Sequence, residues 1–408
     1  MQMNQTIVVL AASTIVFATP RADLHAQGAP AGRVTLRAIR PDASRGAAAA
    51  VVVEEGQLVH AAMLLPVDAG GRLQGPGNAR RQATQVLDNL DLALRAADSS
   101  RQQLVRLHVY VADSSVTPLV DRLLSGQFTG AATPAVTVVE SRLPLAGALV
   151  AMDAVAATAR TMPPGRPARL VVDGLAAMAG GGAHVAIQPE GPFVIVSGRA
   201  APGDFAPAVR QTMEQLRADL AGVGLGFEHV VQVKTFLSDM TRAMEVQQLV
   251  AGVFDGIAPP QVITEWRGAS LPVEIELVAT APGASGGAER LTFVEPISAR
   301  FSRVARVFGG RPVFVSGLVG ASDDPVRQVH EIFAELCRVL GEAGSDLRHL
   351  AKATYYVSDT AADQEINVIR PTLFDADRPP AASKISVQGT GRPGKGATID
   401  MIAVTTSR

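Results

Sequence analysis

One pattern of apolar and polar positions occurs three times along the chain. Each copy is a mostly apolar run of strand length that ends in an aspartate followed by turn residues. The copies occupy residues 104–113, 230–239 and 350–359, so that the closing aspartates lie 126 and 120 positions apart. A repeat of that length carries several elements, which predicts three small domains in one chain.

The elements around this strand are expected in the order ββαβαββ in each copy. In the first copy, Ala83, Val86, Leu87, Leu90 and Leu94 share one face of a predicted helix. At the start of repeats 1, 2 and 3, the predicted hairpins pair residues 49–53 with 58–64, 184–187 with 193–196, and 303–308 with 312–315. At the end of the same repeats, the predicted strand pairs are 134–139 with 148–156, 261–266 with 273–280, and 384–387 with 398–404. We expect residues 28–48 to be poorly ordered at first and the last helix to break at Pro371.

Two linkers rich in Gly and Pro separate the repeats. Together they predict repeats at 27–160, 168–282 and 290–408, preceded by residues 1–26. The apolar run 7–18 has signal-peptide length, and Ala26 offers a small residue at a cleavage point, although no Lys or Arg precedes the run. We expect export to the periplasm or the outside of the cell; the alternative is a frayed strand on a cytoplasmic protein. No other segment is expected to cross a membrane.

The amino-acid composition argues against some classes of binding partner. Of the 408 residues 47% are hydrophobic and 18% are charged, and the net charge is −1, which gives no reason to expect nucleic acid or an acidic membrane. Cys337 is the only cysteine and is predicted to be a buried structural thiol. The chain has no HExxH, no CxxC and no Gly-x-Ser-x-Gly elbow, since the match to that motif at residues 283–287 falls in a predicted linker, and we expect neither a metal nor a cofactor.

Short motifs in a fixed order make each repeat similar to the RidA/YjgF family of enamine/imine deaminases, historically also called perchloric-acid-soluble endoribonucleases. They include Ile195–Gly198, Leu271–Glu276 and Phe314–Gly317, and the resemblance covers roughly residues 48–404. It implies chorismate-mutase-like α+β units, which in the family form trimers around a central barrel with small-molecule clefts between neighbours. Three repeats in one chain would then form an intramolecular pseudo-trimer, which we expect to be a monomer.

The family's functional positions can be carried over repeat by repeat. In repeats 1, 2 and 3 respectively, the family's arginine corresponds to Val136, Gln261 and Ala382, and its cysteine corresponds to Val138, Ile263 and Lys384. In the same order, its tyrosine corresponds to Ala49, His184 and Arg303, and its Ser-Gly pair corresponds to Ala62-Met63, Ser197-Gly198 and Ser316-Gly317. Its asparagine corresponds to Asp121, Gln247 and Asn367, and its glutamate corresponds to Ala151, Glu274 and Thr398. The first repeat has therefore lost every functional position. What the resemblance implies for the other two is a catalytic pair, Glu274 and Ser197, and a set of substrate-binding residues: His184, Gly198, Arg303, Ser316, Gly317, Asn367 and Lys384.

Several of these residues have a second interpretation. Glu274 is either a base acting through water or part of a solvated strand face, and the solvated face is favoured for Glu276. His184 follows three glycines and is either a cleft residue or an exposed histidine, and Lys384 is either a ligand contact or a strand-edge lysine.

The expected ligand is a small metabolite that carries a carboxylate or an imine. Its cationic anchor would be Arg303 or Lys384, or else Arg199 or Arg267. Two functions of different class follow: hydrolysis of enamines or imines to a ketone and ammonia, or a catalytically inactive binding or scaffold protein with vestigial clefts.

Overall fold

The first repeat shows how the predicted strands and helices are realised. The computed structural model describes residues 32–283 and 289–407, and the predicted signal peptide lies outside them. The elements of the first repeat are β1 (Thr35–Asp42), β2 (Ala47–Glu55), β3 (Gln57–Ala61), α1 (Ala79–Ala96), β4 (Leu104–Val111), α2 (Thr117–Ser125), β5 (Ala135–Glu140) and β6 (Val150–Thr158). The order ββαβαββ is confirmed for β2 to β6, with β1 added in front.

The other two repeats have the same order, each again with an additional strand in front. The second contains β7 (Ala168–Leu170), β8 (Val185–Ile187), β9 (Phe193–Arg199), α3 (Phe205–Ala221), β10 (Val230–Leu237), α4 (Ala243–Ala251), β11 (Gln261–Glu265) and β12 (Val273–Thr280). The third contains β13 (Leu291–Ser298), β14 (Phe301–Val307), β15 (Pro312–Leu318), α5 (Pro325–Ala343), β16 (Leu350–Val357), α6 (Thr360–Leu373), β17 (Ala381–Ser386) and β18 (Ala397–Val404). The predicted strand pairings are wrong, because β2 pairs with β1 and β15, β3 pairs with β6 and β8, and β5 and β6 lie on either side of β4 instead of pairing with each other.

Two further expectations about local structure are wrong. Helix α6 runs through Pro371 to Leu373, because a proline this near the end removes only one late hydrogen bond. Cys337 is exposed, since it lies one position after the buried Leu336 and so turns away from the sheet. The expectation that residues 28–48 are poorly ordered at first falls partly on residues 28–31, which lie outside the described residues; from Thr35 the segment forms β1, which pairs with β2 along almost its whole length.

The closing aspartates of the repeated strand cap the helical turns that follow. The side chains of Asp113, Asp239 and Asp359 accept hydrogen bonds from backbone N–H groups two residues later, at 2.8, 3.0 and 2.8 Å. The repeated aspartate is therefore a structural feature of the fold, because it ends a buried strand and starts a helix in each repeat.

The three repeats close into a ring through their strands. Inside each repeat the long central strand pairs in parallel with one closing strand and antiparallel with the other, as β4 does with β5 and β6. Between repeats, β3 pairs with β8, β9 with β14, and β15 with β2, all antiparallel. Because the third repeat returns to the first, the pseudo-trimer and its central barrel are confirmed.

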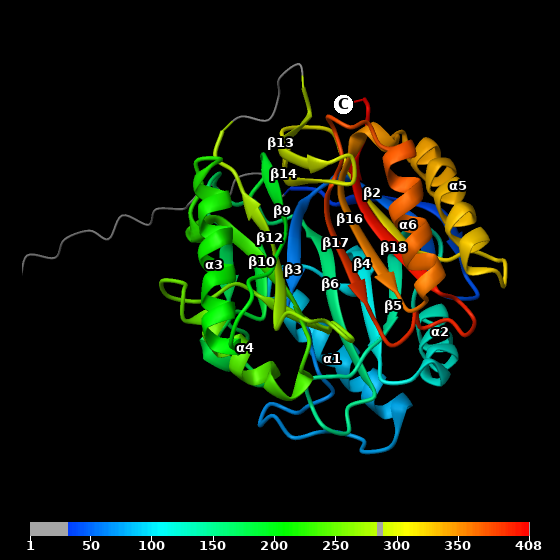
Figure 1. The fold of residues 1–408 in the computed structure, drawn as a ribbon. Helices are drawn as coiled ribbons and strands as arrows, with labels where there is room; N and C mark the ends of the chain where they lie inside the picture. Colours follow the sequence, from blue (N-terminus) through cyan, green and yellow to red (C-terminus); the bar gives the residue numbers. More distant parts are fainter. Residues whose placement is uncertain (1–31, 284–288, 408) are drawn as a thin grey trace, which may run out of the picture. The chain divides into compact units, whose positions relative to one another are not determined.

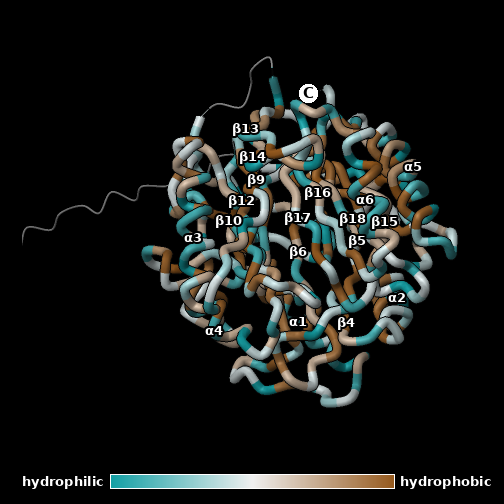
Figure 2. Tube along the Cα trace, in the orientation of Figure 1, coloured by the Kyte–Doolittle hydropathy of each residue, from teal (hydrophilic) through white to brown (hydrophobic). Residues whose placement is uncertain are grey.

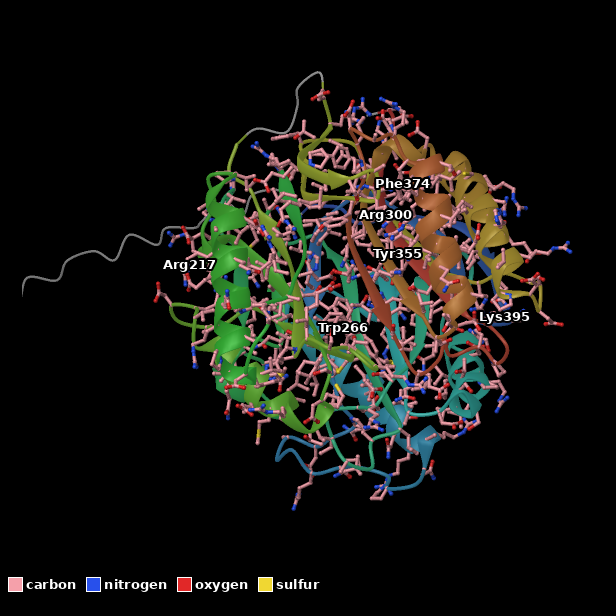
Figure 3. All side chains as sticks on the ribbon, in the orientation of Figure 1. Arg217, Trp266, Arg300, Tyr355, Phe374 and Lys395 are labelled. Atoms are coloured by element: carbon pink, nitrogen blue, oxygen red, sulfur yellow. The ribbon has the colours of Figure 1, made fainter. Side chains whose placement is uncertain are left out.

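Helices cover the outer side of the strands in residues 32–408 (Figure 1). Each repeat has its own helix-on-sheet core, and α5 is amphipathic, with Val329, Ile332, Leu336 and Leu340 buried (Figure 2). Tyr355 of β16 is fully buried in the third core, with the Arg370 guanidinium of α6 4.7 Å from its ring centre (Figure 3). Within residues 32–283 and 289–407, no helix is long and apolar enough to cross a membrane.

Candidate functional site

Each pair of neighbouring repeats forms a junction at equivalent positions. The first junction lies between repeats 1 and 2, the second between repeats 2 and 3, and the third between repeats 3 and 1. At the second junction the Ser197 hydroxyl donates to the carbonyl of Ser302 at 2.6 Å and accepts from the N–H of Ala382 at 2.8 Å. Ser197 therefore ties its own repeat to two strands of the next.

Ser316 repeats this arrangement at the third junction. Its hydroxyl donates to the carbonyl of Ala48 and accepts from the N–H of Val136 at 2.7 Å. A Cβ atom on Gly317 would lie 2.9 Å from Thr137 Cγ2 and 2.9 Å from Thr398 Oγ1, so the two threonines fill the space beside Gly317 that the Glu274 carboxyl group fills beside Gly198. The structure places Ser316 and Gly317 away from the other predicted site residues, at a junction without that carboxylate.

At the first junction Ala62 stands in the place of the serine, and backbone groups make the equivalent contacts. The N–H of Ala62 donates to the carbonyl of His184 at 2.8 Å, and the N–H of Met63 donates to the carbonyl of Gln261 at 3.0 Å. The neighbouring cleft has a volume of about 110 Å³ and a mainly apolar lining that includes Met63, Leu175, Met178 and Gln247. This cleft can hold an apolar group, and its lining includes no carboxylate.

His184 lies in this apolar cleft and is only 1% exposed, so the interpretation as an exposed histidine is wrong. Its Nδ1 accepts from the N–H of Val172 at 2.9 Å, and its Nε2 lies 2.9 Å from the carbonyl of Ala176. That pair of contacts fits the tautomer with the proton on Nε2. Both ring nitrogens are committed to the backbone, which favours a structural role, and substrate binding by His184 stays a prediction.

The second junction contains a carboxyl group in an unusual environment. A Cβ atom on Gly198 would lie 2.0 Å from Glu274 Oε1, so the missing side chain at Gly198 makes room for the carboxyl group. Burial raises the pKa of Glu274 to about 7, and the nearby Glu276 raises it as well. The Ser383 hydroxyl, which has no hydrogen-bond partner of good geometry in the described residues, and Arg303 lower it in part. Such a carboxyl group can exchange a proton near neutral pH.

Arg303 brings a positive charge to the same place from the third repeat. It is 9% exposed, and its Nη1 donates to the carbonyl of Gly198 at 3.2 Å. Its Nε is buried and has no partner among the described residues. Burial and then the charge of Arg199 lower the pKa of the guanidinium, which nonetheless stays protonated. An unpaired, buried N–H of a cation is a ready donor for a carboxylate oxygen.

The other candidates for the cationic anchor already have partners or face solvent. Lys384 Nζ lies 2.5 Å from Asp363 and 3.1 Å from Asn367, so it is neither a free edge lysine nor a free anchor. Arg199 forms a two-point contact with Asp219 at 2.8 and 2.6 Å, and Arg267 is exposed. Arg303 is therefore the anchor that the geometry favours.

Asn367 is also engaged within its own repeat. Its side-chain oxygen accepts from both Lys384 and Arg370, the latter at 2.7 Å. The second junction thus brings together Ser197, Gly198, Glu274 and Arg303, with Lys384 and Asn367 paired to each other nearby. The roles of all six residues stay predictions.

Sequence reasoning missed two features of this region. Ser383, which lies on β17 beside Lys384, was not named as a site residue. The interpretation of Glu276 as part of a solvated face is wrong, because Glu276 is 3% exposed and forms an ion pair with Lys352 inside the barrel. The alternation of polar residues along the repeated strand, Gln232 with Lys234 and Lys352 with Thr354, was the available signal.

Comparisons with known proteins agree with this architecture. The endoribonuclease L-PSP family matches the chain three times, at residues 40–158, 176–281 and 294–405. The chain is also 37% identical over 84 residues to the protein DfrA of Myxococcus xanthus; the match spans 19% of this chain and 62% of DfrA, less than two thirds of its length.

Solved structures of single-repeat length are similar to parts of the chain. A YjgF family protein from Neisseria meningitidis is 27% identical, covering 25% of this chain and 86% of its own, with a TM-score of 0.23. YyfB, a Rid family protein of unknown function from Yersinia pestis, is 26% identical, covering 30% and 98%, with a TM-score of 0.27. The three family matches cover most of the described chain, and the protein therefore belongs to the endoribonuclease L-PSP family, also known as RidA/YjgF, as three tandem repeats in one chain.

Proposed function

We propose that the second junction binds a small metabolite carrying a carboxylate and an imine, and hydrolyses the imine to a ketone and ammonia. The observation that carries the proposal is the half-buried Glu274 carboxyl group, which has a pKa of about 7 and lies beside Gly198, within reach of the charge of Arg303. The first and third junctions have Ala151 and Thr398 at the position of Glu274 and would have structural roles.

The chemistry requires one group that both takes and returns a proton. As a carboxylate, Glu274 would accept a proton from water while the water oxygen bonds to the imine carbon and the C=N electron pair moves to nitrogen. The resulting carboxylic acid would return the proton to that nitrogen, which gives a carbinolamine. Once its nitrogen has taken a second proton from solvent, the Glu274 carboxylate would accept the carbinol O–H proton while the C=O bond forms and the C–N bond breaks, so that ammonia leaves with the C–N electron pair. A pKa near the working pH suits both steps.

Substrate orientation would come from Arg303 rather than from the family's arginine, which is Ala382 at this junction. The unpaired Nε of Arg303 can donate to a substrate carboxylate while Nη1 keeps its bond to Gly198. Ser197 would act indirectly, because its hydroxyl is committed to Ser302 and Ala382 and so fixes the positions of Gly198 and β17.

The alternative, a binding or scaffold protein with vestigial clefts, has its own support. Two of the three junctions lack a carboxylate, and none has the family's arginine, since Val136, Gln261 and Ala382 occupy its positions. A direct assay separates the two functions. Ammonia release is measured from freshly generated 2-iminopropanoate with the wild type and Glu274→Gln, and ligand binding is followed by thermal unfolding with pyruvate.

An imine hydrolase releases ammonia faster than buffer alone, and Glu274→Gln abolishes the difference. A rate equal to buffer, with no thermal shift from pyruvate, contradicts both ligand binding and catalysis at this junction. Intact RNA incubated in parallel tests our further expectation that the chain has no nucleic-acid substrate, based on its net charge of −1 and its 4% of aromatic residues.

We also propose that the protein is exported, because the apolar run 7–18 has the length of a signal-peptide core. N-terminal sequencing of the protein purified from the periplasm or medium would give a start at Gln27. Recovery only from the cytoplasm, with Met1 intact, would contradict export.

A further inference from the structure

The barrel interior is polar between two apolar layers. One apolar layer contains Val51, Ile195, Phe314 and Ile402, and the other contains Tyr110, Phe236 and Tyr356. Between them lie buried charged or titratable side chains from all three repeats: His60, Arg106, His108, Asp153, Lys234, Glu276, Lys352 and Asp400. Charged groups that are this deeply buried need partners, so the pairing of each one is informative.

The three carboxylates are fully paired. Glu276 forms an ion pair with Lys352. His108 lies between the other two, with its Nδ1 3.2 Å from Asp153 and its Nε2 3.0 Å from Asp400. Both contacts are hydrogen bonds only when each ring nitrogen carries a proton, which makes His108 a cation. Asp153 also accepts a hydrogen bond from the Tyr110 hydroxyl at 2.7 Å.

Two further cations in the barrel have no carboxylate within 4.0 Å in the described residues. Lys234 Nζ donates to the Tyr356 hydroxyl at 2.5 Å and lies 5.2–6.0 Å from the ring centres of Tyr356, Phe236 and Tyr110. Arg106 is 5% exposed, and both its Nε and its Nη1 are buried without a hydrogen-bond partner. With His108 charged, four cations therefore share the barrel with three carboxylates, and the excess positive charge lies at Arg106 and Lys234.

A small cavity lies where the unpaired groups meet. It has a volume of about 20 Å³, and its polar lining includes Arg106, Lys234, Lys352 and His60 together with His108, Asp153 and Glu276, which are paired as described above. His60 adds no charge, because burial lowers its pKa to about 4, and its Nδ1 has no partner in the described residues. A cavity of this size holds a single water molecule or an ion of similar size.

A wider, open pocket of about 540 Å³ lies at one end of the barrel, among residues 53–58, 188–193 and 307–312 of the three repeats. It shares Leu58, Gln188 and Phe193 with the inner cavity, so these side chains separate the two spaces. An ion that enters from this end would have to pass these three side chains to reach Arg106.

We propose that the barrel binds one halide-sized anion, chloride under ordinary conditions, held by the Nε–H and Nη1–H groups of Arg106. The anion neutralises the excess positive charge and satisfies two buried donors that come from the first repeat, in a space to which all three repeats contribute. It would therefore stabilise the closed ring, and it is independent of the chemistry proposed for the second junction.

Diffraction from crystals grown or soaked in sodium bromide tests the site directly. The expected result is an anomalous peak beside Arg106 Nε and Nη1. A refined water molecule at that position, without anomalous signal, would overturn the proposal. This measurement uses the wild type and so does not depend on whether any variant folds.

Thermal unfolding gives a second test in solution. The wild type is compared in sodium chloride and in sodium gluconate at equal ionic strength, because gluconate is too large for a cavity of about 20 Å³. Chloride is expected to raise the Tm by about 2–4 °C, as binding only to the folded state does. Arg106→Gln should lose this difference. Arg101→Gln, a control that alters a surface arginine paired with Asp91, should keep it. Equal Tm values of the wild type in the two salts would contradict the anion site.

Discussion

The first and second junctions occupy equivalent places in the ring and have diverged to different chemistry. At the first, backbone groups of Ala62 and Met63 join the repeats, and His184 is held by two backbone contacts beside an apolar cleft. At the second, a serine hydroxyl joins the repeats, and the half-buried Glu274 carboxyl group lies within the electrostatic influence of Arg303, which has an unpaired N–H among the described residues. The backbone frame is shared, so function depends on a few side chains.

The comparison also shows what joining three repeats in one chain allows. In a trimer of identical chains every cleft changes together, whereas here each junction can change alone. The third junction illustrates an intermediate case, since Ser316 keeps the serine contacts of Ser197 while Thr398 replaces the carboxylate. The following variants test whether the second junction is active and the other two are structural.

The largest expected effect is the loss of catalysis in Glu274→Gln. Removing a group that transfers protons lowers kcat by about 10²–10⁴-fold, while an amide of the same shape keeps the packing against Gly198. The measurement is steady-state ammonia release. Glu265→Gln, which changes another buried carboxylate of the second repeat, is the control and should stay within a few-fold of the wild type. Equal loss in both variants would point to a folding defect instead.

The anchor should show its effect in KM. Arg303→Met removes a charged donor to the substrate carboxylate, and the loss of about 1.5–3 kcal/mol raises KM by roughly 10–100-fold. Lys384→Met is the matched comparison, because Lys384 is already paired with Asp363 and should change KM little. If Lys384→Met had the larger effect on KM, the anchor would be assigned wrongly.

Stability should depend on pH through Glu274. Its folded-state pKa of about 7 lies above the ordinary value of 4.5, so the folded protein binds more protons than the unfolded chain between these values. Stability from this group is therefore present at pH 4.5 and below and decreases as pH rises to 7 and above, by about 2–3 kcal/mol in total. Urea unfolding of Glu274→Gln, compared with the wild type from pH 5 to 8, should show a relative stabilisation that grows with pH. A constant difference across that range would show that the carboxyl group is not perturbed.

The smallest and most selective effect concerns the two serines. Ser197→Ala and Ser316→Ala each leave a backbone N–H and a carbonyl without their partner, so each should lower the free energy of unfolding by about 1–3 kcal/mol. Only Ser197→Ala should also reduce ammonia release. A similar loss of activity in Ser316→Ala would show that the third junction contributes to catalysis.

The order of strands and helices in each repeat was predicted well from the sequence, because local apolar patterns and capping residues determine it. The strand that ends at Asp239 is apolar on its helix-facing side, and the aspartate caps the next turn, so both features are visible in the chain. The additional strands β1, β7 and β13 were missed, since each is short or edge-like and acquires its partner only in the folded sheet.

The site was predicted only in part because junctions depend on which repeat meets which. The convergence of Glu274 with Arg303 follows from the pairing of β9 with β14, which the sequence does not specify. The sequence likewise could not show that His184 is tied to backbone groups or that Glu276 pairs with Lys352 across the barrel, because both contacts join distant segments.

The most direct test of a single active junction is a crystal structure of Glu274→Gln soaked with pyruvate, the ketone product of 2-iminopropanoate. The account predicts density at the second junction, with the carboxylate of pyruvate against Arg303 and its carbonyl near Gly198. Density in the apolar cleft beside His184 and Gln247 instead, or no density at any junction at millimolar pyruvate, would contradict it.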